Sequence, residues 1–343
     1  MENTVGIESA QSTEANNSRK TVDFEFKGDG LEYFKIWIVN VMLTIVTLGI
    51  YSAWAKVRNN QYFHSNTYLE NINFRYLAEP LQILKGRIIA IIAFIVYSVT
   101  ASLDPTLAVA MAVTLLLAMP YFINQSLAFN FRMSAYRNIQ FRFSATYLQA
   151  FMVLFVWPII GVLSIGLLYP LALKKMHEYI VGNAKYGTAP FSFKAELKDY
   201  YIILLTILGI GLMMGLPAWG IGALVPDLAF MSIVIVAVMY FGIIIYSMVA
   251  MYNLFYCSIA LQEHQLKAHI TMAGMAKVIF LNAFFTLITL GLYIPAAKVR
   301  MTRYICSCIE LDVAGSLDGF SAAERTKVSA LGEEFGEVFD FGL

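Results

Sequence analysis

Charged residues are scarce in this chain of 343 residues. They make up 14% of the sequence, whereas apolar residues make up 59%; a soluble domain has about 25% charged residues. A soluble fold with this composition would expose apolar patches far larger than monomers tolerate. A bilayer removes this difficulty, because lipid solvates apolar side chains. The composition therefore predicts an integral protein of the cytoplasmic membrane.

Cysteines and catalytic motifs are also scarce. The three cysteines, Cys257, Cys306 and Cys308, include one close pair, and an odd number of cysteines is no disulfide framework. The sequence has no zinc-protease, nucleophile-elbow or P-loop motif, and its four histidines lack metal-ligand spacing. We therefore expect no enzymatic activity, no metal, no cofactor and no nucleic-acid partner.

Four apolar segments are long enough to cross a bilayer, which requires about 20 apolar residues. The first two are joined by Asp104-Pro105 and the last two by Pro226-Asp227, so each pair is predicted to be a helical hairpin with a tight turn. The four segments are Gly86–Leu103, Thr106–Phe129, Tyr200–Val225 and Leu228–Tyr256.

Three further apolar segments contain a glycine before a basic, aromatic continuation. They are Phe34–Ala55 with Gly49, Leu148–Leu173 with Gly166, and Val278–Ala297 with Gly291. If these segments cross the membrane, the Lys and Arg clusters beside them are divided between the two sides. If they enter and return on one side, every cluster is cytoplasmic, in agreement with the positive-inside rule. We favour this re-entrant topology, which places both termini in the cytoplasm.

The chain also repeats itself. Phe24, Gly49 and Tyr62 match Phe141, Gly166 and Tyr179 without gaps, and the motif Gly49-Ile-Tyr51 returns as Gly291-Leu-Tyr293. Such internal repeats define structural units. The predicted division is a disordered polar tail over 1–20, a first membrane unit over 21–130, a second over 131–260, a partial third over 261–320 and an acidic, flexible tail over 321–343.

Short runs of alternating apolar and polar residues precede several hydrophobic segments, and this period is typical of β-strands. Strands this short need partners. We predict that Phe24–Phe26 pairs with Phe74–Tyr76, and Phe141–Phe143 with Phe191–Phe193, on the cytoplasmic face. The predicted fold class is thus an all-α polytopic membrane protein with internal repeats and short cytoplasmic strand pairs.

Two sets of polar residues are candidate sites. The basic set lies among aromatic residues, which is typical of an anchor at the lipid headgroups, but it could also bind anionic headgroups or an anionic solute. The second set is a polar stripe at helical spacing, which either forms interhelical hydrogen bonds or lines a pathway. The basic set is Lys56, Arg58, Lys298 and Arg300; the stripe is Asn40, Thr44 and Thr47, repeated as Asn282, Thr286 and Thr289.

The stretch FEFKGDGLEYFKIWIVNVMLTIVTLGIYSAWAKVRNNQYF, with its recurring A-K-V-R motif, resembles the YjgN-type family of bacterial inner-membrane proteins. The resemblance covers most of residues 22–310, although the second copy has Leu173-Lys174-Lys175 in place of Lys56-Val57-Arg58. It implies a multi-pass protein of the bacterial inner membrane. It carries over no reaction, ligand or site residue.

We therefore expect a transporter, channel or lipid-handling protein for an anionic ligand, with membrane lipids and their anionic headgroups as partners. The alternative is a non-catalytic membrane scaffold or assembly partner. A polar cavity between the two repeat units would favour a ligand, whereas solid packing there would favour a scaffold.

The re-entrant topology makes a prediction about access from outside the cell. On a cysteine-free background, single cysteines at Asp104 and Asp227 should react with a membrane-impermeant maleimide in intact cells. Cysteines at cytoplasmic positions should react only after the cells are opened; these positions are Gln61, Ala135, Lys185 and Glu310. External labelling at Gln61 or Lys185 would contradict the re-entrant topology and favour ordinary crossings.

Overall fold

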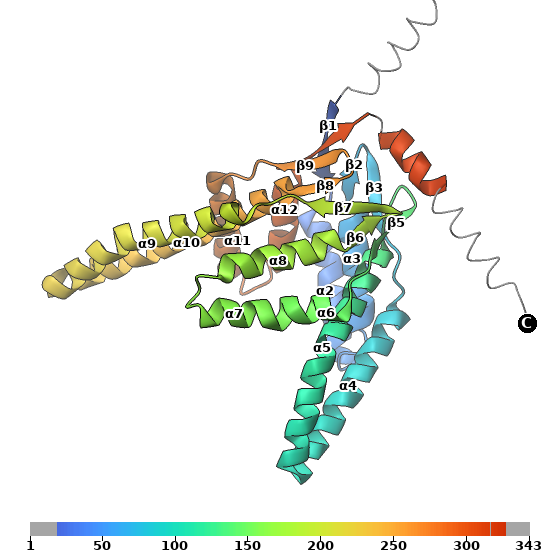
Figure 1. The fold of residues 1–343 in the computed structure, drawn as a ribbon, viewed down its shortest axis with the longest axis horizontal. Helices are drawn as coiled ribbons and strands as arrows, with labels where there is room; N and C mark the ends of the chain where they lie inside the picture. The colour runs from blue at the N-terminus through green and yellow to red at the C-terminus, as the bar shows by residue number, and fades with distance from the viewer. Residues whose placement is uncertain (1–18, 316, 327–343) are drawn as a thin grey trace, which may run out of the picture.

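A closed barrel of ten antiparallel strands forms the centre of the chain in the computed structural model, which describes residues 19–315 and 317–326. Pairs of helices extend outward from this barrel (Figure 1). The strands are β1 (Arg19–Phe26), β2 (Thr67–Leu69), β3 (Ile72–Tyr76), β4 (Ser134–Tyr136), β5 (Ile139–Phe143), β6 (Ala184–Tyr186), β7 (Ala189–Phe193), β8 (Ile259–Leu261), β9 (His264–Ala268) and β10 (Ile309–Ala314).

The barrel corrects the predicted all-α class. The alternating runs are strands, but the predicted direct pairing is wrong: β2 lies between β1 and β3, and Phe24 pairs with Leu69. In the same way β6 lies between β5 and β7. Isolated strand pairs would have left open edges, and closing the barrel removes every edge. The intervening strands have three residues each, too few for alternation to show in the sequence.

Helical hairpins connect the strands at one end of the barrel, and tight turns connect them at the other. Each hairpin starts where one strand ends and returns to start the next strand. Short and long hairpins alternate along the chain. They are α2 (Gly30–Val46) with α3 (Ser52–Ser65); α4 (Pro80–Leu103) with α5 (Pro105–Met133); α6 (Tyr147–Phe151), the π-helical η1 (Met152–Val156) and α7 (Trp157–Leu163) with α8 (Tyr169–Gly182); α9 (Leu197–Leu224) with α10 (Ala229–Cys257) through the 3₁₀ turn η2 (Pro226–Leu228); and α11 (Met272–Ile288) with α12 (Ile294–Cys306).

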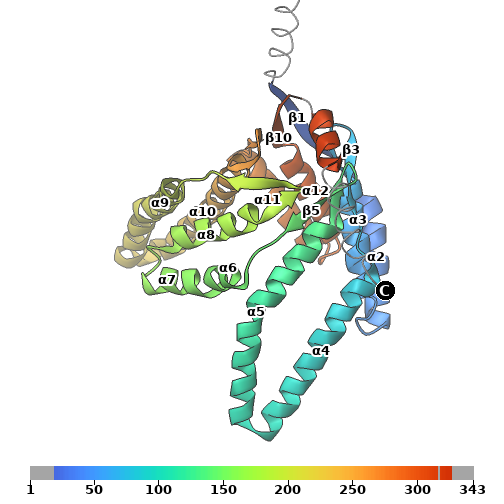
Figure 2. The same cartoon turned by 45° about the vertical axis from the view of Figure 1, so that its right-hand side comes forward.

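The four predicted spans form the two long hairpins, α4–α5 and α9–α10. Their helices have 24 to 29 residues, are apolar enough to cross a membrane, and are almost unburied by the rest of the chain. The two hairpins diverge from the barrel (Figures 1 and 2). Asp104 is the N-cap residue of α5, because its carboxylate accepts hydrogen bonds from the backbone N–H groups of Thr106 and Leu107.

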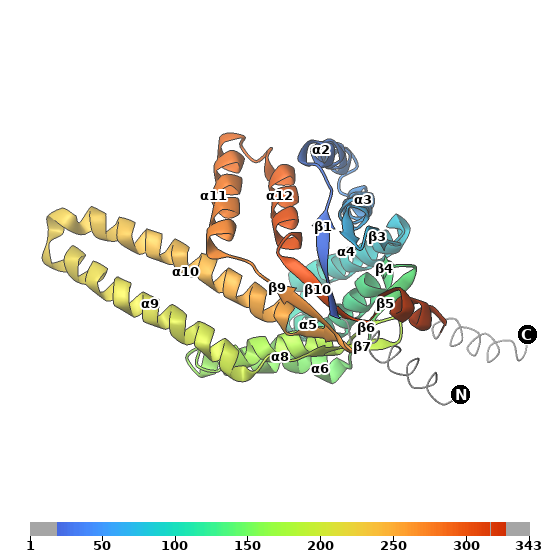
Figure 3. The same cartoon turned by 90° about the horizontal axis from the view of Figure 1, so that it is seen from above.

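The three glycine-centred segments form the short hairpins, each of which reverses once and leads back to the barrel. Figure 3 shows one of them, in which α12 runs back beside α11 toward the barrel. Gly49, Gly166 and Gly291 have φ of 92°, 85° and 93° and follow a residue that also has positive φ. The N–H of each glycine donates to a carbonyl five residues earlier, at 2.8 to 2.9 Å. This bond ends the first helix as a Schellman motif, so the glycine sets the reversal of the chain.

The positive φ of these glycines predicts that replacing them with a residue that has a Cβ destabilises the protein. Gly49→Ala or Gly291→Ala should lower the free energy of unfolding by about 1–2 kcal/mol, because a left-handed backbone brings Cβ close to the carbonyl oxygen. Thermal unfolding in detergent measures this effect. Gly86→Ala is the matched control, because Gly86 lies within α4 with open space around it. A Gly49→Ala variant as stable as Gly86→Ala would contradict the prediction.

Candidate functional site

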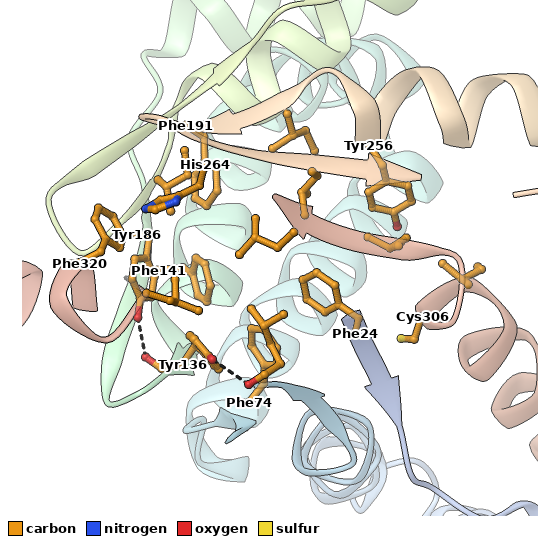
Figure 4. A pocket seen from close by; sticks show the side chains of 18 of the residues that line it. Phe24, Phe74, Tyr136, Phe141, Tyr186, Phe191, Tyr256, His264, Cys306 and Phe320 are labelled. Carbon is orange, nitrogen blue, oxygen red and sulfur yellow. Dashed lines mark hydrogen bonds between the residues drawn. The ribbon is translucent and has the colours of Figure 1, made fainter. Parts of the chain in front are cut away.

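An apolar chamber of about 520 Å³ occupies the inside of the barrel. Small-molecule sites usually measure about 300–1,000 Å³. Four phenylalanines point into this chamber from β1, β3, β5 and β7 (Figure 4). Phe24 stacks against Phe74, and Phe141 against Phe191, with ring centroids 6.3 Å apart in both pairs. The strand alternation that places these rings inside leaves the neighbouring charged residues outside.

Two tyrosine hydroxyls of the chamber are hydrogen-bonded to the barrel itself. The hydroxyl of Tyr136 donates to the carbonyl of Leu69 at 2.8 Å, and the hydroxyl of Tyr186 donates to the carbonyl of Tyr136 at 3.1 Å (Figure 4). Burial raises the pKa of Tyr186 to about 12, so its phenol stays protonated. The chamber therefore presents an apolar surface to any molecule inside it.

His264 also belongs to the chamber wall without adding charge to it. Its Nδ1 accepts a hydrogen bond from the backbone N–H of Ala314 at 3.1 Å. Burial lowers the pKa of this imidazole, because the charged form loses its hydration. The neutral ring, held in place by the end of β10, thus bounds the chamber sterically and does not attract a charged molecule.

Residues 317–326 form a helix that covers the turn end of the barrel. Phe320 packs against Tyr186 and His264, with ring centroids 6.2 and 4.8 Å apart. The buried carboxylate of Glu324 accepts hydrogen bonds from the backbone N–H and the hydroxyl of Thr188. The predicted acidic tail thus begins as a packed helix over 321–326, and residues 327–343 lie outside the described residues.

Arg137 joins this helix to the barrel. Its guanidinium forms a salt bridge with Glu70 at 2.7 Å and another with Asp318. Glu70 and Arg137 each belong to a tight turn between neighbouring strands. The side chains of Arg137 and Glu70 are only 7% and 21% exposed, so this charge-assisted pair is better shielded than an ordinary surface pair.

The other end of the chamber is lined by helix ends. Tyr256 comes from the last turn of α10, and Thr302, Ile305 and Cys306 come from α12. Burial raises the pKa of the Cys306 thiol to about 11. The chamber therefore lies between the C-terminal helix and the helices that extend from the barrel.

The four predicted basic residues have different immediate partners. Arg58 donates to the hydroxyl of Tyr51 at 3.1 Å, and the guanidinium of Arg300 lies 5.3 Å from the ring of Tyr293. Each arginine thus contacts the tyrosine at the start of its own returning helix. Lys298 lies 4.3 Å from the ring of Phe63, and Lys56 is exposed. Their binding to an anion stays a prediction.

The predicted polar stripes lie within the short hairpins. Asn40 donates to Asn59 at 3.1 Å, and Asn282 donates to the carbonyl of Ala297 at 3.1 Å, so both asparagines link the two helices of a hairpin. The hydroxyls of Thr47 and Thr289 accept the N–H groups that begin the returning helices. Thr44 donates to the carbonyl of Asn40, and Thr286 provides the carbonyl bonded by Gly291. These bonds favour interhelical bonding over a pathway lining.

The chamber and its C-terminal helix were missed by the sequence analysis. The predicted strand runs include four residues of the chamber wall, since Phe24, Phe74, Phe141 and Phe191 lie at their apolar positions. Phe320 was an available signal, because a large aromatic residue in a polar segment needs a surface to pack against. Which surface it covers depends on the closed barrel.

Comparisons with known proteins agree on one family. A model of the family described as "Bacterial protein of unknown function (DUF898)" matches residues 21–338. Inner membrane protein YjgN of Salmonella typhimurium is 22% identical, over 88% of this chain and 91% of that protein. Inner membrane protein YjgN of Escherichia coli O157:H7 is 26% identical over 45% of this chain and 39% of that protein. No solved structure matches the chain significantly.

The position of the C-terminal helix predicts that it limits the entry of small molecules into the chamber. In a variant whose single cysteine is Cys306, Phe320→Ala should increase the rate of alkylation severalfold, because the ring that packs against the chamber wall is removed. Mass spectrometry of alkylated protein in detergent measures the rate. The control is Ala323→Ser, because Ala323 is exposed on the same helix. Equal rates in the two variants would show that the helix does not limit access.

Proposed function

The chain belongs to the bacterial family of unknown function DUF898, and because membership brings no activity with it, we propose a function from the chamber. This protein is a lipid-handling protein of the bacterial inner membrane, and its barrel accepts the apolar part of a membrane lipid. The observation that carries the proposal is the apolar chamber of about 520 Å³, which ends beside the helices that extend from the barrel.

The proposed membrane arrangement follows from the connections of the barrel. All helical hairpins leave from the same barrel end, so the barrel lies on one side of the bilayer. The long hairpins α4–α5 and α9–α10 cross and return, with Asp104 and Asp227 outside. The Lys and Arg residues near the barrel favour a cytoplasmic location for it, with both termini on that side. The names of the relatives, inner membrane proteins, support the inner membrane as the location.

The chemistry of the chamber favours a lipid over a polar solute. We expected a ligand site to be a polar cavity between the two units, but the cavity inside the barrel is apolar. A polar or charged solute would lose its hydration there, at a cost of several kcal/mol unless new hydrogen bonds replace it. A hydrocarbon chain has no such cost, and its burial is favourable. Lipid handling is therefore preferred over ion conduction or transport of a polar solute.

Filling the chamber tests this proposal. Native mass spectrometry of the purified full chain should detect retained lipid in the wild type and at least severalfold less in Leu266→Trp, because the indole takes the volume of the hydrocarbon chain. Ser192→Trp is the matched control: it adds the same ring at an exposed position of β7.

Thermal unfolding of both variants separates loss of lipid from loss of the fold. Equal lipid retention in wild type and Leu266→Trp, with the fold intact, would refute lipid binding in the chamber. An empty wild-type chamber would favour the non-catalytic scaffold instead.

A further inference from the structure

Equivalent residues on the outer face of the barrel oppose one another at five places. Each place joins one of the strands β1, β3, β5, β7 and β9 to the next strand in the chain that pairs with it. The residue concerned on the first strand directly follows a residue that points into the barrel. The pairs are Glu25 with Tyr68, Arg75 with Ala135, Arg142 with Lys185, Ser192 with Ala260, and Lys267 with Glu310. Among these five pairs, Arg142 with Lys185 has two charges of the same sign.

The pair of Lys267 with Glu310 has opposite charges instead. Lys267 also forms a salt bridge with Asp312 at 2.9 Å. Arg142 and Lys185 are exposed, and neither forms a salt bridge or side-chain hydrogen bond within the described part of the chain. Like charges directly opposite each other on a sheet are destabilising, so this arrangement costs stability unless an anion lies between them.

A third basic residue borders the same place. Arg132, in the last turn of α5, lines a surface pocket of about 540 Å³ together with Arg142 and Lys185. Gln140 and Ser144 contribute polar groups, and no acidic residue lines the pocket. Thr188 also lines it, but its N–H and hydroxyl already donate to the carboxylate of Glu324. A basic residue in the last turn of a helix interacts favourably with the helix dipole, which would explain Arg132 alone. The helix dipole explains neither the pairing of Arg142 with Lys185 nor the pocket. Three cations and neutral hydrogen-bonding groups are instead the chemistry that binds phosphate.

The position of the pocket indicates where such a phosphate would come from. Helix α5 has 29 residues, and about 20 cross the hydrocarbon core, so its last turn lies at the membrane surface. Basic pockets beside membrane helices on the cytoplasmic side bind anionic headgroups. We propose that Arg132, Arg142 and Lys185 form a phosphate-binding site, occupied by the headgroup of an anionic lipid or by a free phosphate compound. The site goes beyond the proposed lipid chamber, because it lies on the outer face of the barrel, but its assignment to a headgroup rests on the membrane arrangement proposed above.

The test compares two double variants of the full chain that remove the same charge. Arg142→Gln with Lys185→Gln removes the opposed pair, whereas the control, Lys27→Gln with Lys267→Gln, removes two lysines that already have acidic partners. Native mass spectrometry in detergent measures binding of phosphatidylglycerol and of phosphatidylcholine. A basic residue near an anionic surface contributes about 1 kcal/mol, so affinity for phosphatidylglycerol should fall about fivefold for each removed charge.

The expected result is a loss of phosphatidylglycerol binding in the first variant, near-normal binding in the control, and equal phosphatidylcholine binding in both. Relief of repulsion should also raise the unfolding temperature of the first variant without phosphate, so failure to fold is not expected to hide the result. Inorganic phosphate identifies the source. Binding of millimolar phosphate alone to the wild type, lost in the first variant, favours a free phosphate compound, whereas phosphatidylglycerol binding without binding of phosphate alone favours the headgroup.

Unchanged phosphatidylglycerol binding in the first variant, or an equal loss in both variants, would overturn the site. A Leu266→Trp variant that loses lipid from the chamber but retains this charge-dependent binding would separate the two proposals.

Discussion

The main-chain hydrogen bonds of the barrel are the interaction on which the other parts of the structure depend. Its strands have three to eight residues, and strands this short are not stable without partners on both sides. Closing the ring by pairing β1 with β10 gives every strand two neighbours. Each helical hairpin must then lead the chain back to the next strand of the barrel. The helices are therefore long insertions between neighbouring strands of one small β-structure.

The sequence predicted the helices well because their signals are local. Composition and length identified α4, α5, α9 and α10, and the glycines identified the three reversals at Gly49, Gly166 and Gly291. The barrel was not predicted, because β2, β4, β6 and β8 have three residues each. Such segments have no measurable period, and their identity as strands comes from partners that are distant in the sequence.

The candidate sites could be predicted only in part, for a related reason. Arg58 and Arg300 were chosen because they recur in the sequence, yet each contacts a tyrosine of its own hairpin. Arg142 and Lys185 were visible as basic residues, but their opposition depends on the register between β5 and β6. The role of a charged residue depends on what lies opposite it, and here that neighbour is set by tertiary pairing.

Pairing of the first strand with the last has a consequence for the order in which the protein can form. During synthesis β1 emerges first, and one of its two partners, β10, is among the last described residues to be made. Until then one edge of β1 is unpaired while the helical hairpins enter the membrane. Such edges invite pairing with other chains, and non-local pairing is slow. The ribosome must therefore release almost the whole chain before this protein can protect its own first strand.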